Sequence, residues 1–82
     1  MKIKYFAWIK DIKKNEEEYI YINESNNNIN KLKELLIKKY PNLKKHIDSE
    51  ILRFAVNQEY VTNNINLNSN DEIAIFPPVS GG

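Results

Sequence analysis

The sequence contains no cysteine, and this absence removes several kinds of chemistry at once. Disulfide bonds, thiolate nucleophiles, iron–sulfur clusters and most structural zinc sites all require cysteine. With a single histidine, His46, no cluster of metal ligands is expected, and His46 is interpreted as an ordinary surface or helix-end side chain. None of the four serines has a histidine at a spacing suited to nucleophilic catalysis.

Long apolar runs and an excess of one charge are also missing. No run approaches the ~20 residues of a membrane span, and the first residues lack a signal-peptide pattern, so the cytoplasm is the expected compartment. The net charge is +1 with both signs mixed along the chain, which does not favour a nucleic-acid partner. A chain of 82 residues is expected to form one domain with one modest core.

Glycine is scarce as well, since the chain has only two, Gly81 and Gly82. Without a Cβ, these residues would let the walls of a partner close around the backbone and a nucleophile approach the terminal carboxyl. The main-chain carboxylate of Gly82 is therefore the group with the clearest chemical potential. The alternative interpretation is an inert, frayed terminus.

Two of the three prolines, Pro77 and Pro78, follow the short apolar run Ile73–Phe76. This run predicts a buried strand that ends at Phe76 or Pro77. Proline fixes φ and pushes the preceding residue towards extended geometry, so the departing chain should be stiff and extended. We expect a folded body over residues 1–78 and an extended, flexible tail over residues 79–82.

The first part of the chain predicts a hairpin. Apolar and polar residues alternate over residues 2–9, and residues 19–22 are aromatic and β-branched, so each segment is expected to be a strand. The acidic triplet at residues 16–18 is interpreted as a solvated strand entry, since neighbouring residues on a strand point to opposite faces.

The remainder predicts one main helix and three further strands. Apolar residues recur at helical spacing over residues 29–40, after a cap at Asn26, Asn27 or Asn28, and Pro41 follows. A short helical turn is expected near residues 43–47, and Asn70 is expected in a left-handed turn. The predicted strands cover residues 51–56, 60–61 and 73–76. This order predicts an α+β fold of the β-grasp (ubiquitin-like) type, a mixed sheet of four to five strands with one main helix packed across it.

Three segments resemble the family of the small subunit of molybdopterin synthase, a ubiquitin-like sulfur carrier. They are Tyr5–Trp8, Ala55–Gln58 and, most specifically, Asp71–Gly82 with its Phe-Pro-Pro-Val-Ser-Gly-Gly end. The family usually has Gly where this chain has Asn70, and often Thr where it has Ser80.

The resemblance implies that an E1-like enzyme uses ATP to adenylate Gly82, which then becomes a thiocarboxylate. Its sulfur would go to cyclic pyranopterin monophosphate and form the dithiolene of molybdopterin. This chain would donate sulfur and bind no cofactor, while the active site would lie on the large subunit in a heterotetramer of two small and two large subunits.

The resemblance also implies a docking patch for the large subunit at Phe6, Tyr60 and Phe76, to which the residues alone add Trp8; ordinary core positions are the alternative. The tail residues expected to contact the partner are Pro77, Pro78, Val79 and Ser80, followed by Gly81 and Gly82. Three other functions remain open: a thiazole-pathway sulfur carrier, a protein modifier conjugated through Gly82, and a non-covalent interaction module.

Overall fold

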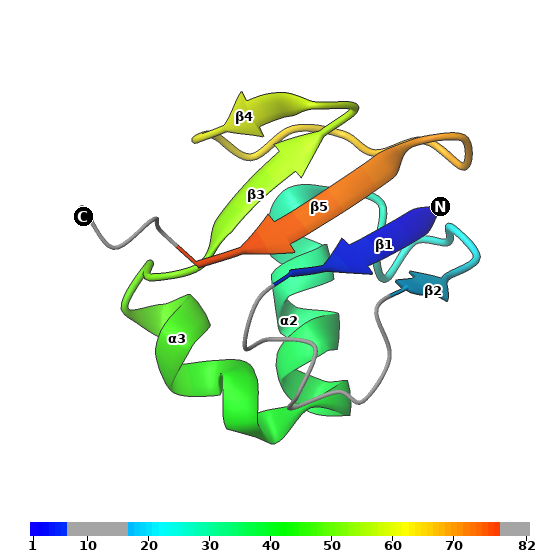
Figure 1. Cartoon of the computed structure of the whole chain (residues 1–82). Coiled ribbons are helices and arrows are strands. Elements are labelled where there is room, and N and C mark those ends of the chain that lie inside the picture. Colours follow the sequence, from blue (N-terminus) through cyan, green and yellow to red (C-terminus); the bar gives the residue numbers. More distant parts are fainter. Residues whose placement is uncertain (7–16, 78–82) are drawn as a thin grey trace.

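The computed structural model describes residues 1–6 and 17–77, which form a five-stranded sheet with a helix packed across one face (Figure 1). The strands are β1 (Lys2–Tyr5), β2 (Glu17–Tyr19), β3 (Arg53–Val56), β4 (Glu59–Val61) and β5 (Glu72–Phe76). The helices are α2 (Ile29–Lys39), the 3-10 turn η1 (Pro41–Leu43) and α3 (Lys44–Asp48). The predicted α+β, β-grasp arrangement is confirmed.

The last strand of the chain lies in the middle of the sheet. The strand order is β2-β1-β5-β3-β4, with β5 parallel to β1 and antiparallel to β3. Ile73 and Ile75 of β5 are completely buried, as expected for a central strand that faces a helix. The site at which the chain leaves the sheet is therefore anchored by pairing on both sides.

Helix α2 begins at the predicted residue and ends at Lys39, one residue before the predicted end. The Asn28 side chain accepts a hydrogen bond from the Lys31 backbone N–H (2.8 Å), which satisfies one free donor of the first turn. Lys38 and Lys39 occupy the last turn, where positive charge is favourable, and Pro41 follows.

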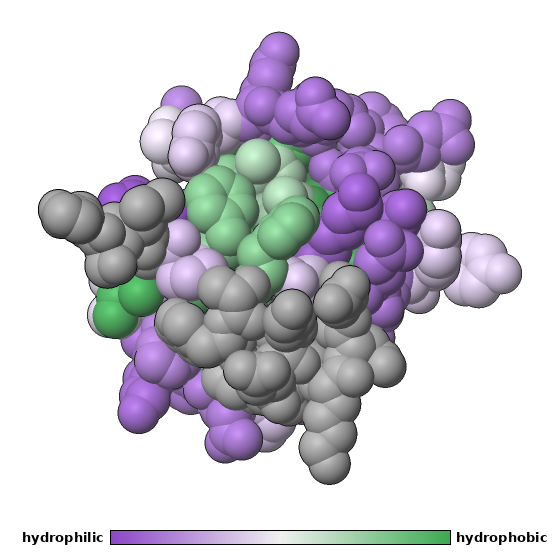
Figure 2. Space-filling model, viewed as in Figure 1, coloured by the Kyte–Doolittle hydropathy of each residue, from purple (hydrophilic) through white to green (hydrophobic). Residues whose placement is uncertain are grey.

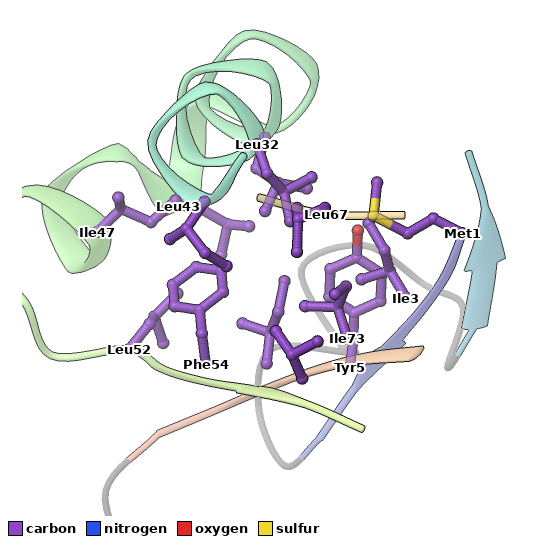
Figure 3. Packing of buried hydrophobic residues seen from close by; sticks show 14 residues of the cluster. Met1, Ile3, Tyr5, Leu32, Leu43, Ile47, Leu52, Phe54, Leu67 and Ile73 are labelled. Carbon is purple, nitrogen blue, oxygen red and sulfur yellow. The ribbon is translucent and has the colours of Figure 1, made fainter. Parts of the chain in front are cut away.

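The core lies between α2 and the inner face of the sheet (Figure 3). Leu32 of α2, Ile3 of β1 and Ile73 of β5 belong to this core, and all three are completely buried. Each side chain of this size contributes roughly 1.5–3 kcal/mol through burial. Leu43 of η1 and Ile47 of α3 also belong to the core, which confirms the predicted helical turn.

The second strand is displaced from its predicted position. The prediction of residues 19–22 was wrong, because β2 is Glu17–Tyr19 and Glu18 lies opposite Ile3 of β1. Ile20 and Ile22 pack against the core from outside the strand. The acidic segment pairs with β1 because Glu18 has partners on the inner side of the sheet.

Glu18 joins three elements through its carboxylate. Its Oε1 accepts a hydrogen bond from the Tyr5 hydroxyl (2.9 Å), and its Oε2 accepts bonds from Tyr40 Oη and Lys39 Nζ (both 2.8 Å). The Tyr5 and Tyr40 rings also meet edge to face at 6.2 Å. We call Tyr5, Glu18, Lys39 and Tyr40 the Glu18 brace. A purely solvated role for the acidic triplet is thus wrong at Glu18.

Burial opposes ionisation of Glu18, yet the hydrogen bonds from Lys39, Tyr40 and Tyr5 together outweigh it and lower the pKa of the carboxyl. Burial and the hydrogen bond to Glu18 raise the pKa of Tyr40 to about 12. Burial, with the charge of Glu18, also raises the pKa of Tyr5. Both hydroxyls therefore keep their protons near neutral pH and donate them to a charged acceptor.

Turns without glycine rely on three residues with positive φ. Among residues 1–6 and 17–77 these are Glu50 (59°), Asn57 (52°) and Gln58 (72°). Asn57 and Gln58 form the two-residue connection between β3 and β4, as predicted, with the backbone that a tight hairpin needs. The prediction of a left-handed conformation for Asn70 was wrong, because Asn70 is not among the residues with positive φ.

Within residues 1–6 and 17–77, no helix is long and apolar enough to cross a membrane.

Candidate functional site

The outer face of the sheet, opposite α2, carries an apolar patch that hydrophilic residues border above and on the right in the view of Figure 2. Side chains alternate along β5, so the inward Ile73 and Ile75 leave Ala74 and Phe76 on the outer face. Ala74 and Phe76 are half-buried. The apolar character of β5 on both faces therefore has two causes: one face forms the core, and the other forms part of this patch.

The pairing register places Tyr60 on the same patch. Ala74 of β5 lies opposite Ala55 of β3, which lies opposite Tyr60 of β4. The small alanines leave space above the sheet, and the Tyr60 and Phe76 rings meet across it at 5.5 Å and 62°. This edge-on geometry is favourable for aromatic rings.

Phe6 completes the patch at the end of β1. Its backbone N–H donates to the Ile75 carbonyl (3.1 Å), which holds it beside β5. Because Tyr5 points into the core, Phe6 points outward, and it is 46% exposed. We call the following set the apolar face: Phe6, Ala55, Tyr60, Ala74 and Phe76.

The exposure of these rings decides between core and patch. Phe6 at 46% and Tyr60 at 73% exposure do not belong to the core, and Phe76 is half-buried only. Exposed aromatic side chains that gather on one face are typical of an interaction surface.

Charged residues border the apolar face. On one side, Lys2 lies 3.5 Å from Glu17 and Lys4 lies 3.1 Å from Glu72, so these charges are compensated within the chain. On the other side, Arg53 of β3 lies opposite Phe76 and is exposed. The alternation that places Phe54 in the core directs Arg53 to the outer face.

The hairpin that carries Tyr60 is fixed to the start of β5 by Asn57. The Asn57 amide donates to Asp71 Oδ1 (2.9 Å), and its oxygen accepts from the Glu72 backbone N–H (3.0 Å). The Asn57 N–H also donates to the Glu72 carbonyl (2.8 Å). These bonds hold β4 in a fixed position relative to β5, and therefore Tyr60 relative to Phe76.

The structure brings together the described members of the predicted docking patch. Phe6, Tyr60 and Phe76 share the apolar face, and Pro77 is half-buried directly after β5. Six predicted site residues lie outside the described residues: Trp8, Pro78, Val79, Ser80, Gly81 and Gly82.

His46 is half-buried in α3. Within residues 1–6 and 17–77, no group of three or more His, Cys, Asp or Glu side chains could hold a metal ion.

Three residues of this surface were not singled out from the sequence as site residues. Ala55 and Ala74 are small and uncharged, and Arg53 resembles any other surface cation. Side chains alternate between the two faces along β3 and β5, so these three residues can be assigned to the outer face once the inward residues of each strand are known.

Comparisons with known proteins agree with this geometry. Residues 3–82 match the sequence profile of the ThiS family. The molybdopterin synthase sulfur carrier subunit of Dictyostelium discoideum is 41% identical over 87 residues, which cover 99% of this chain and 94% of that protein.

Two solved structures are similar over most of the chain. A Pyrococcus furiosus protein proposed to be molybdopterin converting factor subunit 1 has a TM-score of 0.80 and 28% identity, covering 95% of each chain. A chain in the complex of subunits 1 and 2 of molybdopterin-converting factor from Helicobacter pylori has a TM-score of 0.69 and 27% identity, covering 99% of this chain and 96% of that chain. This protein therefore belongs to the ThiS/MoaD family of ubiquitin-like domains.

Proposed function

We propose that this chain is the sulfur carrier subunit of a molybdopterin synthase, with Gly82 as the residue that carries sulfur. The observation that carries the proposal is the apolar face at the end of β5, from which the sequence continues directly through Pro-Pro-Val-Ser to Gly-Gly. The name of the Dictyostelium discoideum relative supports the same assignment. In this proposal the body over residues 1–78 docks, and the tail over residues 79–82 reaches a partner's active site.

The chemistry follows from the terminal carboxylate. A carboxylate is a poor electrophile, so an E1-like enzyme first joins it to AMP from ATP and releases pyrophosphate. A sulfur nucleophile such as hydrosulfide then attacks the carbonyl carbon, forming a C–S bond while AMP leaves. The thiocarboxylate at Gly82 would pass its sulfur to cyclic pyranopterin monophosphate, and water would restore the carboxylate. No cysteine is needed on this chain, and ATP is bound and used by the activating enzyme rather than by this chain. The cytoplasm is the expected compartment for this ATP-dependent step.

The large subunit is the partner that we propose for the apolar face. The Helicobacter pylori structure is a complex of subunits 1 and 2 of molybdopterin-converting factor, which supports a partner of this kind. Ordering four tail residues in a cleft would cost ~4–8 kcal/mol of backbone entropy. Burial of Phe6, Tyr60 and Phe76, at roughly 1.5–3 kcal/mol for each large side chain, would offset that cost.

The tail would then contribute position rather than affinity. Pro77 and Pro78 would limit the directions available to Val79 and Ser80, and the two glycines would let Gly82 enter a narrow channel. The active site would lie on the large subunit. The family resemblance implies an assembly of two small and two large subunits.

The test is the intact mass of the purified chain after incubation with an activating enzyme, ATP and sulfide. Replacing one oxygen by sulfur adds about 16 Da at Gly82. A variant that lacks Gly82 and the wild type without ATP serve as controls, and neither should gain this mass. The loaded chain is then mixed with the large subunit and cyclic pyranopterin monophosphate, and formation of molybdopterin is measured. A chain that gains no mass, or a loaded chain that yields no molybdopterin, would refute the proposal.

A further inference from the structure

We propose that Arg53 binds a carboxylate on the large subunit and steers that subunit onto the apolar face. This inference rests on the proposed function, since it names a contact within the same docking surface. Arg53 is exposed on β3, directly opposite Phe76 in the sheet. It therefore stands at the edge of the apolar face where the chain leaves β5.

The charges of the outer face divide into two groups. Lys2 and Lys4 each have an acidic neighbour within the chain, Glu17 and Glu72. Arg53, by contrast, has no ion pair within residues 1–6 and 17–77. A cation without a counter-ion beside an apolar surface is complementary to a partner with an apolar centre and an acidic rim.

The guanidinium group favours a carboxylate as the complementary group. Its planar fork donates two parallel hydrogen bonds to one carboxylate, and it loses hydration more readily than an ammonium group does. Arg53 is also held by a strand that pairs with β5 and β4, so its position relative to Phe76 and Tyr60 is fixed before binding. An acidic side chain of the large subunit that meets Arg53 would set the orientation of docking.

A rim ion pair acts mainly on the rate of association. Opposite charges accelerate encounter at low salt, and added salt screens this effect. The association rate of wild-type chain and large subunit should therefore fall as salt rises. Arg53→Glu, which places two negative charges opposite each other, should slow association roughly tenfold at low salt, with the difference shrinking at high salt.

Lys38→Glu provides the matched control. Lys38 is exposed on α2, which packs on the opposite face of the sheet, and its substitution changes the net charge by the same amount. Arg53→Lys is the conservative variant, which should recover most of the association rate but dissociate faster, because a single ammonium group cannot make the paired hydrogen bonds. Urea unfolding of each variant verifies that the fold is intact.

The association rates are measured by stopped-flow mixing with the purified large subunit at low and at high salt. Slowing by Arg53→Glu alone, removed by salt, supports the proposal. Equal association rates for Arg53→Glu and Lys38→Glu overturn it. The proposal is also overturned if Arg53→Glu slows association with the activating enzyme but not with the large subunit. If the wild-type chain itself fails to bind the large subunit, the proposed function fails first, which separates the two failures.

Discussion

Phe76 occupies the last position of β5, where the core of the sheet ends and the chain turns towards its tail. Its neighbours Ile73 and Ile75 are completely buried, while Phe76 itself remains half-buried against the Tyr60 ring. A phenylalanine in this position gains little from folding alone, because α2 covers the other face of the sheet. Its remaining exposed surface is available to a partner.

Phe76→Ala is therefore expected to weaken binding of the large subunit much more than it weakens the fold. We expect a loss of about 1–3 kcal/mol in binding free energy, because the proposed interface loses the contacts of an aromatic anchor. Isothermal titration measures the affinity, and urea unfolding verifies that the variant is folded. Tyr21→Ala is the control, since Tyr21 is 94% exposed and does not belong to the apolar face. Equal affinities of the wild type and Phe76→Ala would remove Phe76 from the interface.

At the scale of elements, the hydrophobic pattern predicted α2, β3 and β5 well, because each has a buried side that repeats at a fixed spacing. The pattern failed at β2, where an apolar segment lies next to an acidic one. The strand was decided by Glu18, which needs the hydroxyls of Tyr5 and Tyr40 on the inner side of the sheet. Contacts over such distances in the sequence cannot be read from local periodicity.

The candidate site, too, could be predicted from the sequence only in part. The aromatic residues of the apolar face could be named from the sequence through the family resemblance, but their exposure could not. Arg53 became recognisable only when the register placed it opposite Phe76 and the neighbouring lysines proved to be paired. Which charges are compensated is a property of the sheet and not of the local sequence.

The Glu18 brace connects β1, β2 and the end of α2, so its loss should affect how these elements hold together. Glu18→Gln is expected to destabilise the protein by about 1–2 kcal/mol at pH 7, because charged hydrogen bonds are replaced by weaker neutral ones. Urea unfolding measures the free energy. Glu24→Gln, an exposed position, is the control and should change it little.

The effect of Glu18 should depend on pH. Its pKa is lower in the folded state than the ordinary value of 4.5, so the folded state favours the ionised carboxylate. This stabilisation is complete above pH 4.5 and is lost as the pH falls through the lower folded pKa. The difference between the wild type and Glu18→Gln should therefore shrink from pH 7 to pH 3. A difference that stays constant over this range would contradict a charged role for Glu18.

At the scale of the whole molecule, the two faces of the sheet have different roles. One face is closed by α2, η1 and α3 and supplies the stability, and the other presents the apolar face with Arg53 at its edge. The buried residues of the described part all lie between Met1 and Ile75. The fold and the proposed chemistry are therefore expected to be separable.

Removal of residues 79–82 tests this separation. Because none of the described core residues lies beyond Ile75, we expect the free energy of unfolding to change by less than about 0.5 kcal/mol, as measured in urea. The shortened chain should still bind the large subunit through Phe6, Tyr60 and Phe76. It should therefore compete with the full-length chain for that subunit. It should gain no sulfur from the activating enzyme. A marked loss of stability would mean that these residues belong to the folded body, and failure to compete would mean that the tail, rather than the apolar face, holds the partner.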